Sequence, residues 1–183
     1  ILTDLASNGR SFYGMILAHL GVAMFVVGIT LVSNYGQEKD VRMSPGGVQE
    51  VAGYRFLFHG VTTQRGPNYM AARGHFQIFD GQRPVAELWP EKRSYFASQK
   101  PMTEASIDWG FTRDLYVSLG EPLEGGDWAL RLYYKPYVRW IWLGALLMAL
   151  GGLLAITDRR YRLARGLGRA RTGVADNAAI AGS

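Results

Sequence analysis

Histidine and cysteine, which often bind metals or act in catalysis, are few or absent in this chain. It contains three histidines and no cysteine, so it offers no thiolate metal site, disulfide or cysteine nucleophile. His19 stands out because it lies within Gly14–Val32, a run of 19 residues without Asp, Glu, Lys or Arg. Burying an ionisable residue in such a run is costly, so we expect it to have a partner or a function.

The surroundings of His19 limit its chemistry. A structural role would be a hydrogen bond to a neighbouring helix, and the functional roles are haem ligation, another metal site or a proton relay. Apolar surroundings, nearby small residues and a neutral imidazole suit an axial ligand of haem iron. Metal-dependent hydrolysis is disfavoured because no His-Glu-x-x-His pattern occurs. A proton path is disfavoured because His19 is the only ionisable residue in the two hydrophobic runs, Gly14–Val32 and Trp140–Thr157.

The other polar candidates favour structural roles. His59 and His75 fall in β-prone runs, which indicates sheet-edge or core residues rather than ligands. Glu104, Asp108 and Asp114 are interpreted as solvated or salt-bridged carboxylates, because the sequence places no two of them as an acid–base pair.

An aromatic and basic run, RLYYKPYVRWIW, spans residues 131–142. Its Trp, Tyr, Lys and Arg residues favour an interfacial belt that fixes the following helix at a membrane surface. The same residue types could hold an anionic, planar partner, because Arg and Lys pair with carboxylates and aromatic rings cover a flat face.

Two transmembrane helices are predicted, over residues 14–32 and 140–157. At about 1.5 Å per residue, 19 residues cover nearly 30 Å, the hydrocarbon thickness of a bilayer. Small residues recur along both runs, and we expect each stripe to pack against a further helix. The small residues are Gly14, Ala18, Gly21 and Gly28 in the first run and Ala145, Ala149 and Gly152 in the second.

The charge distribution predicts the topology. Residues 158–183 carry six Arg against two Asp, so this basic tail, expected to be partly disordered, is placed in the cytoplasm. Residues 1–13 are then also cytoplasmic, and residues 33–139 face the periplasm in a Gram-negative cell. That middle segment has thirteen Lys or Arg against twelve Asp or Glu, which argues against nucleic-acid binding.

The middle segment reads as an all-β domain. Eight or nine short β-prone runs alternate with turn signals such as Asp80-Gly81 and Gly125-Gly126, a pattern typical of a small sandwich or barrel. The predicted strands are 38–43, 48–51, 54–62, 74–79, 84–89, 93–97, 103–108, 113–119 and 128–135. The fold class is therefore a membrane α+β protein in which two helices flank a β domain.

Several longer motifs extend over about residues 13–162. They are Gly14-Met15-x-x-Ala18-His19-Leu20-Gly21, Asp40-Val41-Arg42-Met43, Met102-Thr103-Glu104-Ala105, Thr112-Arg113-Asp114-Leu115-Tyr116, Arg131-Leu132-Tyr133-Tyr134-Lys135-Pro136, Val138-Arg139-Trp140-Ile141-Trp142 and Asp158-x-x-Tyr161-Arg162. Together these motifs resemble one family, the CcmF/NrfE haem lyase subunits of bacterial cytochrome c maturation.

The resemblance implies a function. CcmF-type proteins are polytopic proteins of the bacterial inner membrane that receive haem from the periplasmic haem chaperone CcmE. With CcmH/CcmI-type subunits they help attach it to apocytochrome c. The resemblance implies an OB-like barrel for the periplasmic domain. It also implies that His19 is an axial ligand of a non-covalent, b-type haem.

Other features of that family are absent from this sequence. It has no Trp-rich haem-handling segment and no further histidine in a hydrophobic run. We therefore expect a C-terminal fragment or one chain of a split protein, which is not catalytic alone and completes its haem site with the remaining CcmF helices. The alternative is a non-catalytic, membrane-anchored docking module in which His19 is structural.

Overall fold

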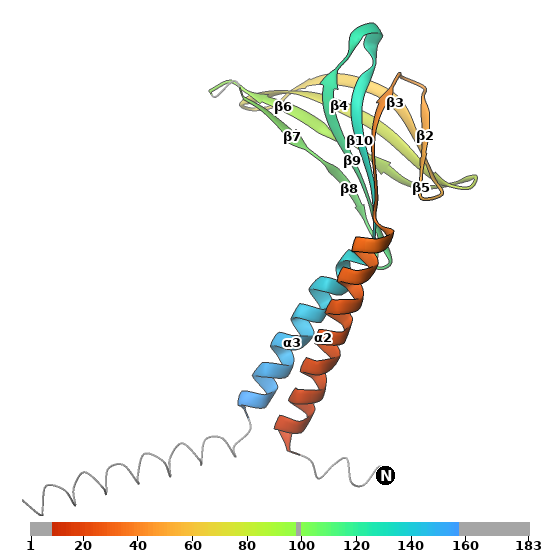
Figure 1. The fold of residues 1–183 in the computed structure, drawn as a ribbon. Coiled ribbons are helices and arrows are strands. Elements are labelled where there is room, and N and C mark those ends of the chain that lie inside the picture. The colour runs from red at the N-terminus through yellow and green to blue at the C-terminus, as the bar shows by residue number, and fades with distance from the viewer. Residues whose placement is uncertain (1–8, 98–99, 158–183) are drawn as a thin grey trace, which may run out of the picture. The chain divides into compact units, whose positions relative to one another are not determined.

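A computed structural model describes residues 9–97 and 100–157 (Figure 1). The chain divides into two compact units. One is helical, and its described part comprises residues 9–27 and 141–157. The other comprises Gly28–Trp140 and contains the strands. The basic tail and the segment before Gly9 lie outside the described residues, so the predictions made for them are not tested.

Two long helices are formed by the hydrophobic runs. Helix α2 covers Arg10–Tyr35 and helix α3 covers Val138–Ile156. Both are long and apolar enough to cross a membrane. At about 1.5 Å per residue, the 26 residues of α2 extend for almost 40 Å. The prediction of two apolar helices flanking a β domain is confirmed, and the chain is a membrane protein.

Glycines hold the helical unit together. A Cβ placed on Gly14 would lie 2.6 Å from the carbonyl oxygen of Gly151, and one on Gly21 would lie 2.7 Å from that of Gly144. Such backbone contact is possible only without side chains, and it is how small residues associate helices in lipid. The expectation that the small stripe of α2 packs against a further helix is therefore wrong, because α3 covers it.

The face of α3 differs from the prediction as well. Gly144 and Gly151 are buried against α2, whereas Gly152 has open space around its missing Cβ and Ala149 is exposed. The predicted stripe of Ala145, Ala149 and Gly152 is thus wrong by about one residue around the helix. The predicted and the observed stripe both have small residues three to seven positions apart, so spacing in the sequence does not distinguish the two.

The β unit consists of two antiparallel sheets. The four-stranded sheet has the order β1-β10-β9-β8, and the larger one has β2-β3-β4-β6-β7 with β5 paired to β4. The strands are β1 (Gln37–Met43), β2 (Val48–Val51), β3 (Tyr54–Arg65), β4 (Tyr69–Asp80), β5 (Arg83–Leu88), β6 (Glu91–Tyr95), β7 (Pro101–Glu104), β8 (Ser106–Trp109), β9 (Arg113–Pro122) and β10 (Trp128–Pro136).

The sandwich form follows from one switch of sheet. The run predicted as a single strand, 103–108, is two strands, β7 and β8, which pair with β6 and β9 respectively. The chain thus passes from one sheet to the other at Ala105. Of the two predicted forms, sandwich and barrel, the structure has the sandwich, because its strands form two separate sheets. The domain is therefore a two-sheet sandwich rather than the OB-like barrel that the resemblance implies.

The core lies between the two sheets. Phe56, Phe58 and Phe76 from the six-stranded sheet meet Leu115 and Leu132 from the four-stranded sheet, and all five are fully buried. The rings of Phe58 and Phe76 stack with centroids 4.8 Å apart. Alternate residues of these strands face outward, as is usual when each sheet buries one face.

Candidate functional site

His19 lies on the face of α2 that α3 leaves uncovered. At 100° per residue, its side chain is about 140° around the helix from Gly14, the centre of the contact with α3. The side chain is exposed in this chain. Its Nδ1–H donates a hydrogen bond to the carbonyl oxygen of Met15 at 2.8 Å, one turn earlier.

That hydrogen bond decides which nitrogen can bind a metal. A carbonyl oxygen only accepts, so Nδ1 of His19 carries the proton and the lone pair of the neutral ring is on Nε2. Histidine ligands of metals are commonly oriented in this way, with the second ring nitrogen donating to a carbonyl. The hydrogen bond to Met15 orients the ring, and the lone pair on Nε2 is free to bind a metal.

The surface around His19 is apolar. Met15, Leu20, Val22 and Val26 are all exposed on α2 near it. Such a face could hold a flat, apolar group with a metal centre, and His19 Nε2 would then be available to bind the metal. In the described part of both helices there is no second histidine, and the described residues contain no cluster of three His, Cys, Asp or Glu. A second histidine ligand, if the site used one, would therefore come from outside the described parts of α2 and α3.

The other two histidines come together on the outer face of the six-stranded sheet. His59 occupies the bulge where the pairing of β3 with β4 shifts, and its ring stacks on His75 at 4.5 Å. His75 in turn stacks on Trp89 at 3.9 Å, with the planes 1° apart. β4 is paired on both sides around His75, and Phe76 next to it faces the core, so His75 is neither at a sheet edge nor in the core as predicted. His59 is exposed and lies beyond the residues of β3 that pair with β2, so for His59 the sheet-edge prediction is confirmed.

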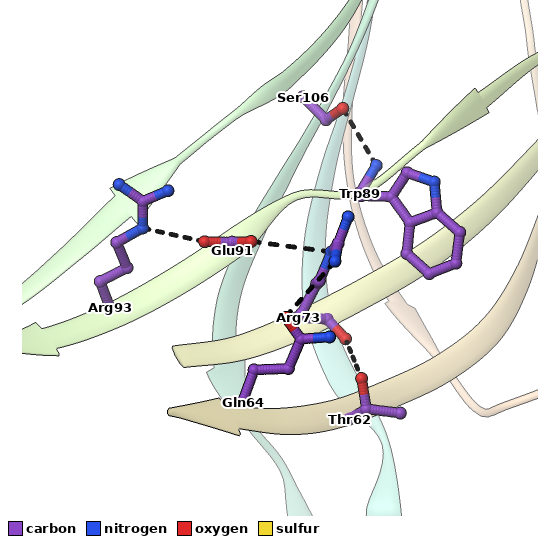
Figure 2. A network of polar contacts seen from close by, with 7 residues as sticks. All are labelled: Thr62, Gln64, Arg73, Trp89, Glu91, Arg93 and Ser106. Atoms are coloured by element: carbon purple, nitrogen blue, oxygen red, sulfur yellow. Dashed lines mark hydrogen bonds and ion pairs between the residues drawn. The ribbon is translucent and has the colours of Figure 1, made fainter. Parts of the chain in front are cut away.

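A basic residue closes this stack. The guanidinium of Arg73 lies 4.7 Å from the centre of the Trp89 ring and donates to Gln64. Figure 2 shows Arg73 placed between Trp89, Gln64 and Glu91, with Arg93 on the far side of Glu91. This group could not be predicted from the sequence, because its members meet only through strand register.

The environment of His75 disfavours its charged form. Burial lowers the pKa of His75, and the nearby His59 and Arg73 lower it further, while Glu87 acts in the opposite direction. Its Nε2 is buried and has no hydrogen-bond partner. The ring of His75 therefore serves as a neutral, flat packing element.

The carboxylates are paired, as predicted. Glu104 lies 3.4 Å from Arg93, and Asp108 forms an ion pair with Arg113. Asp114 is buried, and its Oδ1 accepts a hydrogen bond from the backbone N–H of Gly110 at 3.1 Å. No two of these groups form an isolated acid–base pair, so their geometry indicates structural roles.

Comparison with known proteins identifies the family of this chain. Residues 34–136, which contain the whole sandwich, match the model of the CcmF C-terminal beta-sandwich. The chain belongs to the CcmF family. It is 53% identical to the cytochrome c-type biogenesis protein CcmF of Pseudomonas aeruginosa over 163 residues, which is 89% of this chain and 25% of that protein.

Other relatives of CcmF agree. The CcmF of Escherichia coli K12 is 51% identical over 83% of this chain and 24% of its own length, and NrfE of Haemophilus influenzae is 38% identical over 83% and 24%. A solved structure, cytochrome c heme lyase CcmF, shares the fold with a TM-score of 0.67 and 23% identity over 81% of this chain and 25% of that one. The chain thus spans about a quarter of the length of these CcmF-type relatives.

The residues of the aromatic and basic run, 131–142, contact different neighbours in this CcmF-family chain. Arg131 forms an ion pair with Asp40, whereas Lys135 lies 5.2 Å from the centre of the Tyr133 ring. Beside Arg131 the small residues Gly120 and Ala129 leave a hollow of about 570 Å³ on the outer face of the four-stranded sheet. The predicted partner of this run, a membrane surface or an anionic planar group, stays a prediction.

Proposed function

We propose that this chain is the C-terminal portion of a cytochrome c haem lyase, which takes haem from a periplasmic haem chaperone and helps attach it covalently to apocytochrome c. Family membership supports the general role, since the relatives are named for cytochrome c biogenesis and the solved structure for haem lyase. The observation that carries the proposal for this chain is the free Nε2 of His19 on an apolar, uncovered helix face.

His19 is the proposed axial ligand of a non-covalent, b-type haem. Its Nε2 is available because Nδ1 is bonded to Met15, and the ring cannot be satisfied by α3, which packs on a different face. In hydrocarbon an imidazole without a partner is costly. When bound, the haem iron would satisfy that nitrogen, and exposed Leu20 and Val22 would lie beside the macrocycle.

The site is completed by helices that cover the same face of α2. Leu20, Val26 and Ile29 are exposed there, so a further helix would bury apolar surface and could bring the second axial ligand. These helices are the remaining CcmF helices. The described parts of α2 and α3 contain no second histidine that could be this ligand.

The proposed placement in the cell follows the charge asymmetry. The termini are cytoplasmic, residues 14–32 and 140–157 cross the bacterial inner membrane, and residues 33–139 face the periplasm. There the sandwich would be within reach of the haem chaperone CcmE, CcmH/CcmI-type subunits and apocytochrome c. The support for this orientation is the Arg-rich sequence after Asp158.

Substitution of His19 tests the proposal. In the complete haem lyase assembly, His19→Ala should lower the bound b-type haem and the yield of holocytochrome c by about tenfold or more, as expected when a metal site loses a ligand or its support. Val27→Ala, at an exposed position two turns further along α2, is the matched control and should leave both unchanged.

A chemical rescue separates ligation from packing. Imidazole added to His19→Gly should restore the haem absorption spectrum, because the free base can enter the space of the missing ring. Unchanged haem content and cytochrome yield in His19→Ala would overturn the assignment of His19. That result would instead favour a docking module in which His19 is structural.

A further inference from the structure

The turn between β8 and β9 exposes two large aromatic side chains. Residues 109–112, here named the β8–β9 tip, include Trp109, which is 68% exposed, and Phe111, which is 58% exposed. Single exposed apolar residues are common on protein surfaces, but two bulky aromatic residues in one four-residue turn are not needed for its backbone geometry. Their position suggests what they contact.

The β8–β9 tip is attached to the first turn of α3. The backbone N–H of Tyr137 donates to the carbonyl oxygen of Thr112 at 2.9 Å. The Phe111 ring lies 6.0 Å from that of Trp140, and Tyr137 packs edge-on against Trp140 at 5.0 Å. The tip is thus level with the residues at which a membrane-spanning helix begins.

The tip is also held in a fixed conformation. Buried Asp114 accepts the N–H of Gly110, and Asp108 forms an ion pair with Arg113 across the turn. A side chain at Gly110 would meet the carbonyl oxygen of Arg113 at 2.8 Å, so the turn is as tight as glycine allows. These contacts keep the turn closed while Trp109 and Phe111 stay outside it.

A cation accompanies the aromatic pair. The guanidinium of Arg139, in the first turn of α3, lies 4.3 Å from the centre of the Trp109 ring. Its side chain is 41% exposed, and the nearest carboxylate, Asp114, is 3.8 Å away. The guanidinium is partly exposed, and its buried Nε has no hydrogen-bond partner. A guanidinium beside aromatic rings is suited to a phosphate group, which it can bind through two parallel hydrogen bonds.

We infer that the β8–β9 tip is a third membrane contact of this chain, in which Trp109 and Phe111 enter the interfacial layer of the bilayer and Arg139 pairs with a lipid phosphate. Trp concentrates at that layer because its ring is apolar while its N–H is polar. Phe is common beside Trp on surfaces that enter the boundary between headgroups and acyl chains, because its ring is apolar. A lipid surface is favoured because the tip is continuous with Tyr137 and Trp140, where α3 enters the membrane.

Fluorescence quenching tests this contact directly. This chain has no cysteine of its own, so Phe111→Cys can carry a single bimane label. The full polypeptide is reconstituted into phosphatidylcholine–phosphatidylglycerol vesicles that contain lipids with a nitroxide near the headgroup. Leu123→Cys is the control, because Leu123 is an exposed apolar residue in the turn at the other end of β9.

We expect quenching by the nitroxide lipids to be at least about threefold greater at position 111 than at position 123, and quenching by aqueous iodide to be correspondingly weaker at position 111. Equal quenching at the two positions would overturn the inference. Protection from iodide at position 111 without quenching by lipid would also overturn it, because a protein surface would then cover the tip.

The role of Arg139 has a separate readout. With the label at position 111, Arg139→Gln should reduce the gain in nitroxide quenching that phosphatidylglycerol gives over pure phosphatidylcholine by about half or more, whereas Arg139→Lys should keep most of it. If Arg139→Gln and Arg139→Lys gave the same gain in quenching, Arg139 would not contact a lipid phosphate. Circular dichroism of each variant verifies that the sandwich is folded.

Discussion

The α2 face around His19 and the outer face of the six-stranded sheet around His75 place the same side chain in opposite conditions. His19 is oriented by one hydrogen bond to Met15 and keeps its Nε2 free on an exposed helix. His75 lies between His59 and Trp89, and its Nε2 is buried without a partner. In the first arrangement a ring nitrogen is available to bind a metal. In the second the flat faces of the ring pack against its neighbours.

The comparison shows why residue type alone does not identify a site. An imidazole binds a metal through a lone pair that must be accessible and correctly directed. Stacking needs only a flat face and gains from a neutral ring. The same three histidines can thus be divided into one candidate ligand and two packing residues once their ring nitrogens and ring planes are known.

The largest effect is expected from disturbing the contact between α2 and α3. This contact determines which face of α2, the one that carries His19, stays uncovered. A Cβ on Gly151 would lie 2.5 Å from the backbone nitrogen of Ala18, and both sides of this contact are backbone. Gly151→Val should therefore lower the free energy of unfolding in detergent by about 3 kcal/mol, or prevent folding. It should also remove bound haem in the complete assembly, because the helix pair separates.

Gly152→Val is the matched control for that experiment. Its missing Cβ has nothing within 4 Å, and the substitution has the same effect on helix propensity. We expect a near-neutral change in stability and unchanged haem content. Equal losses for the two variants would show that α2 and α3 do not pack through Gly151.

A smaller effect is expected from the stacked histidine. His75→Ala removes ring contacts with His59 and Trp89, which should cost about 1 kcal/mol of unfolding free energy in detergent. Bound haem should not change. This is the reverse of His19→Ala, which should lose haem with little change in stability, so loss of haem in His75→Ala would contradict the contrast between the two histidines.

The same histidine should also give the stability of the sheet a pH dependence. The pKa of His75 is lowered in the folded state by burial and by His59 and Arg73, so the unfolded chain binds the proton more readily. The unfolding free energy should thus fall as the pH drops below about 6.5, by less than about 1.4 kcal/mol per pH unit.

Denaturation curves at pH 7.5 and pH 5.5 measure this dependence, and His75→Phe should reduce it because the ring is kept while the titrating group is lost. A pH dependence that is unchanged in His75→Phe would assign the effect to another group.

Much of the fold was predictable because it depends on local patterns. The two uncharged runs predict α2 and α3, and turn signals such as Asp80-Gly81 predict hairpins that the structure contains. What could not be predicted depends on partners distant in the sequence. The switch of sheet at Ala105 has no turn residue to mark it, and the one-residue difference in the α3 face depends on which small residues meet α2.

The candidate site divides in the same way. His19 could be identified because an ionisable residue in an apolar run is conspicuous in the sequence itself. Its free nitrogen could not, since the bond to Met15 depends on the rotamer. The stack of His59, His75 and Trp89 was missed because it requires the bulge in β3 and the register of β3 on β4, which short patterns do not encode.

The pairing of β1 with β10 has a consequence for the order in which this chain folds. Asp40 and Arg131 are partners across these strands although 91 residues separate them. The ribosome therefore completes α2 and nine strands before β1 can find its neighbour, and closing so long a loop is slow. Until β10 is made, β1 lacks its strand partner, and α3 follows β10 almost at once. Completion of the four-stranded sheet and insertion of the second helix are thus close in time during synthesis.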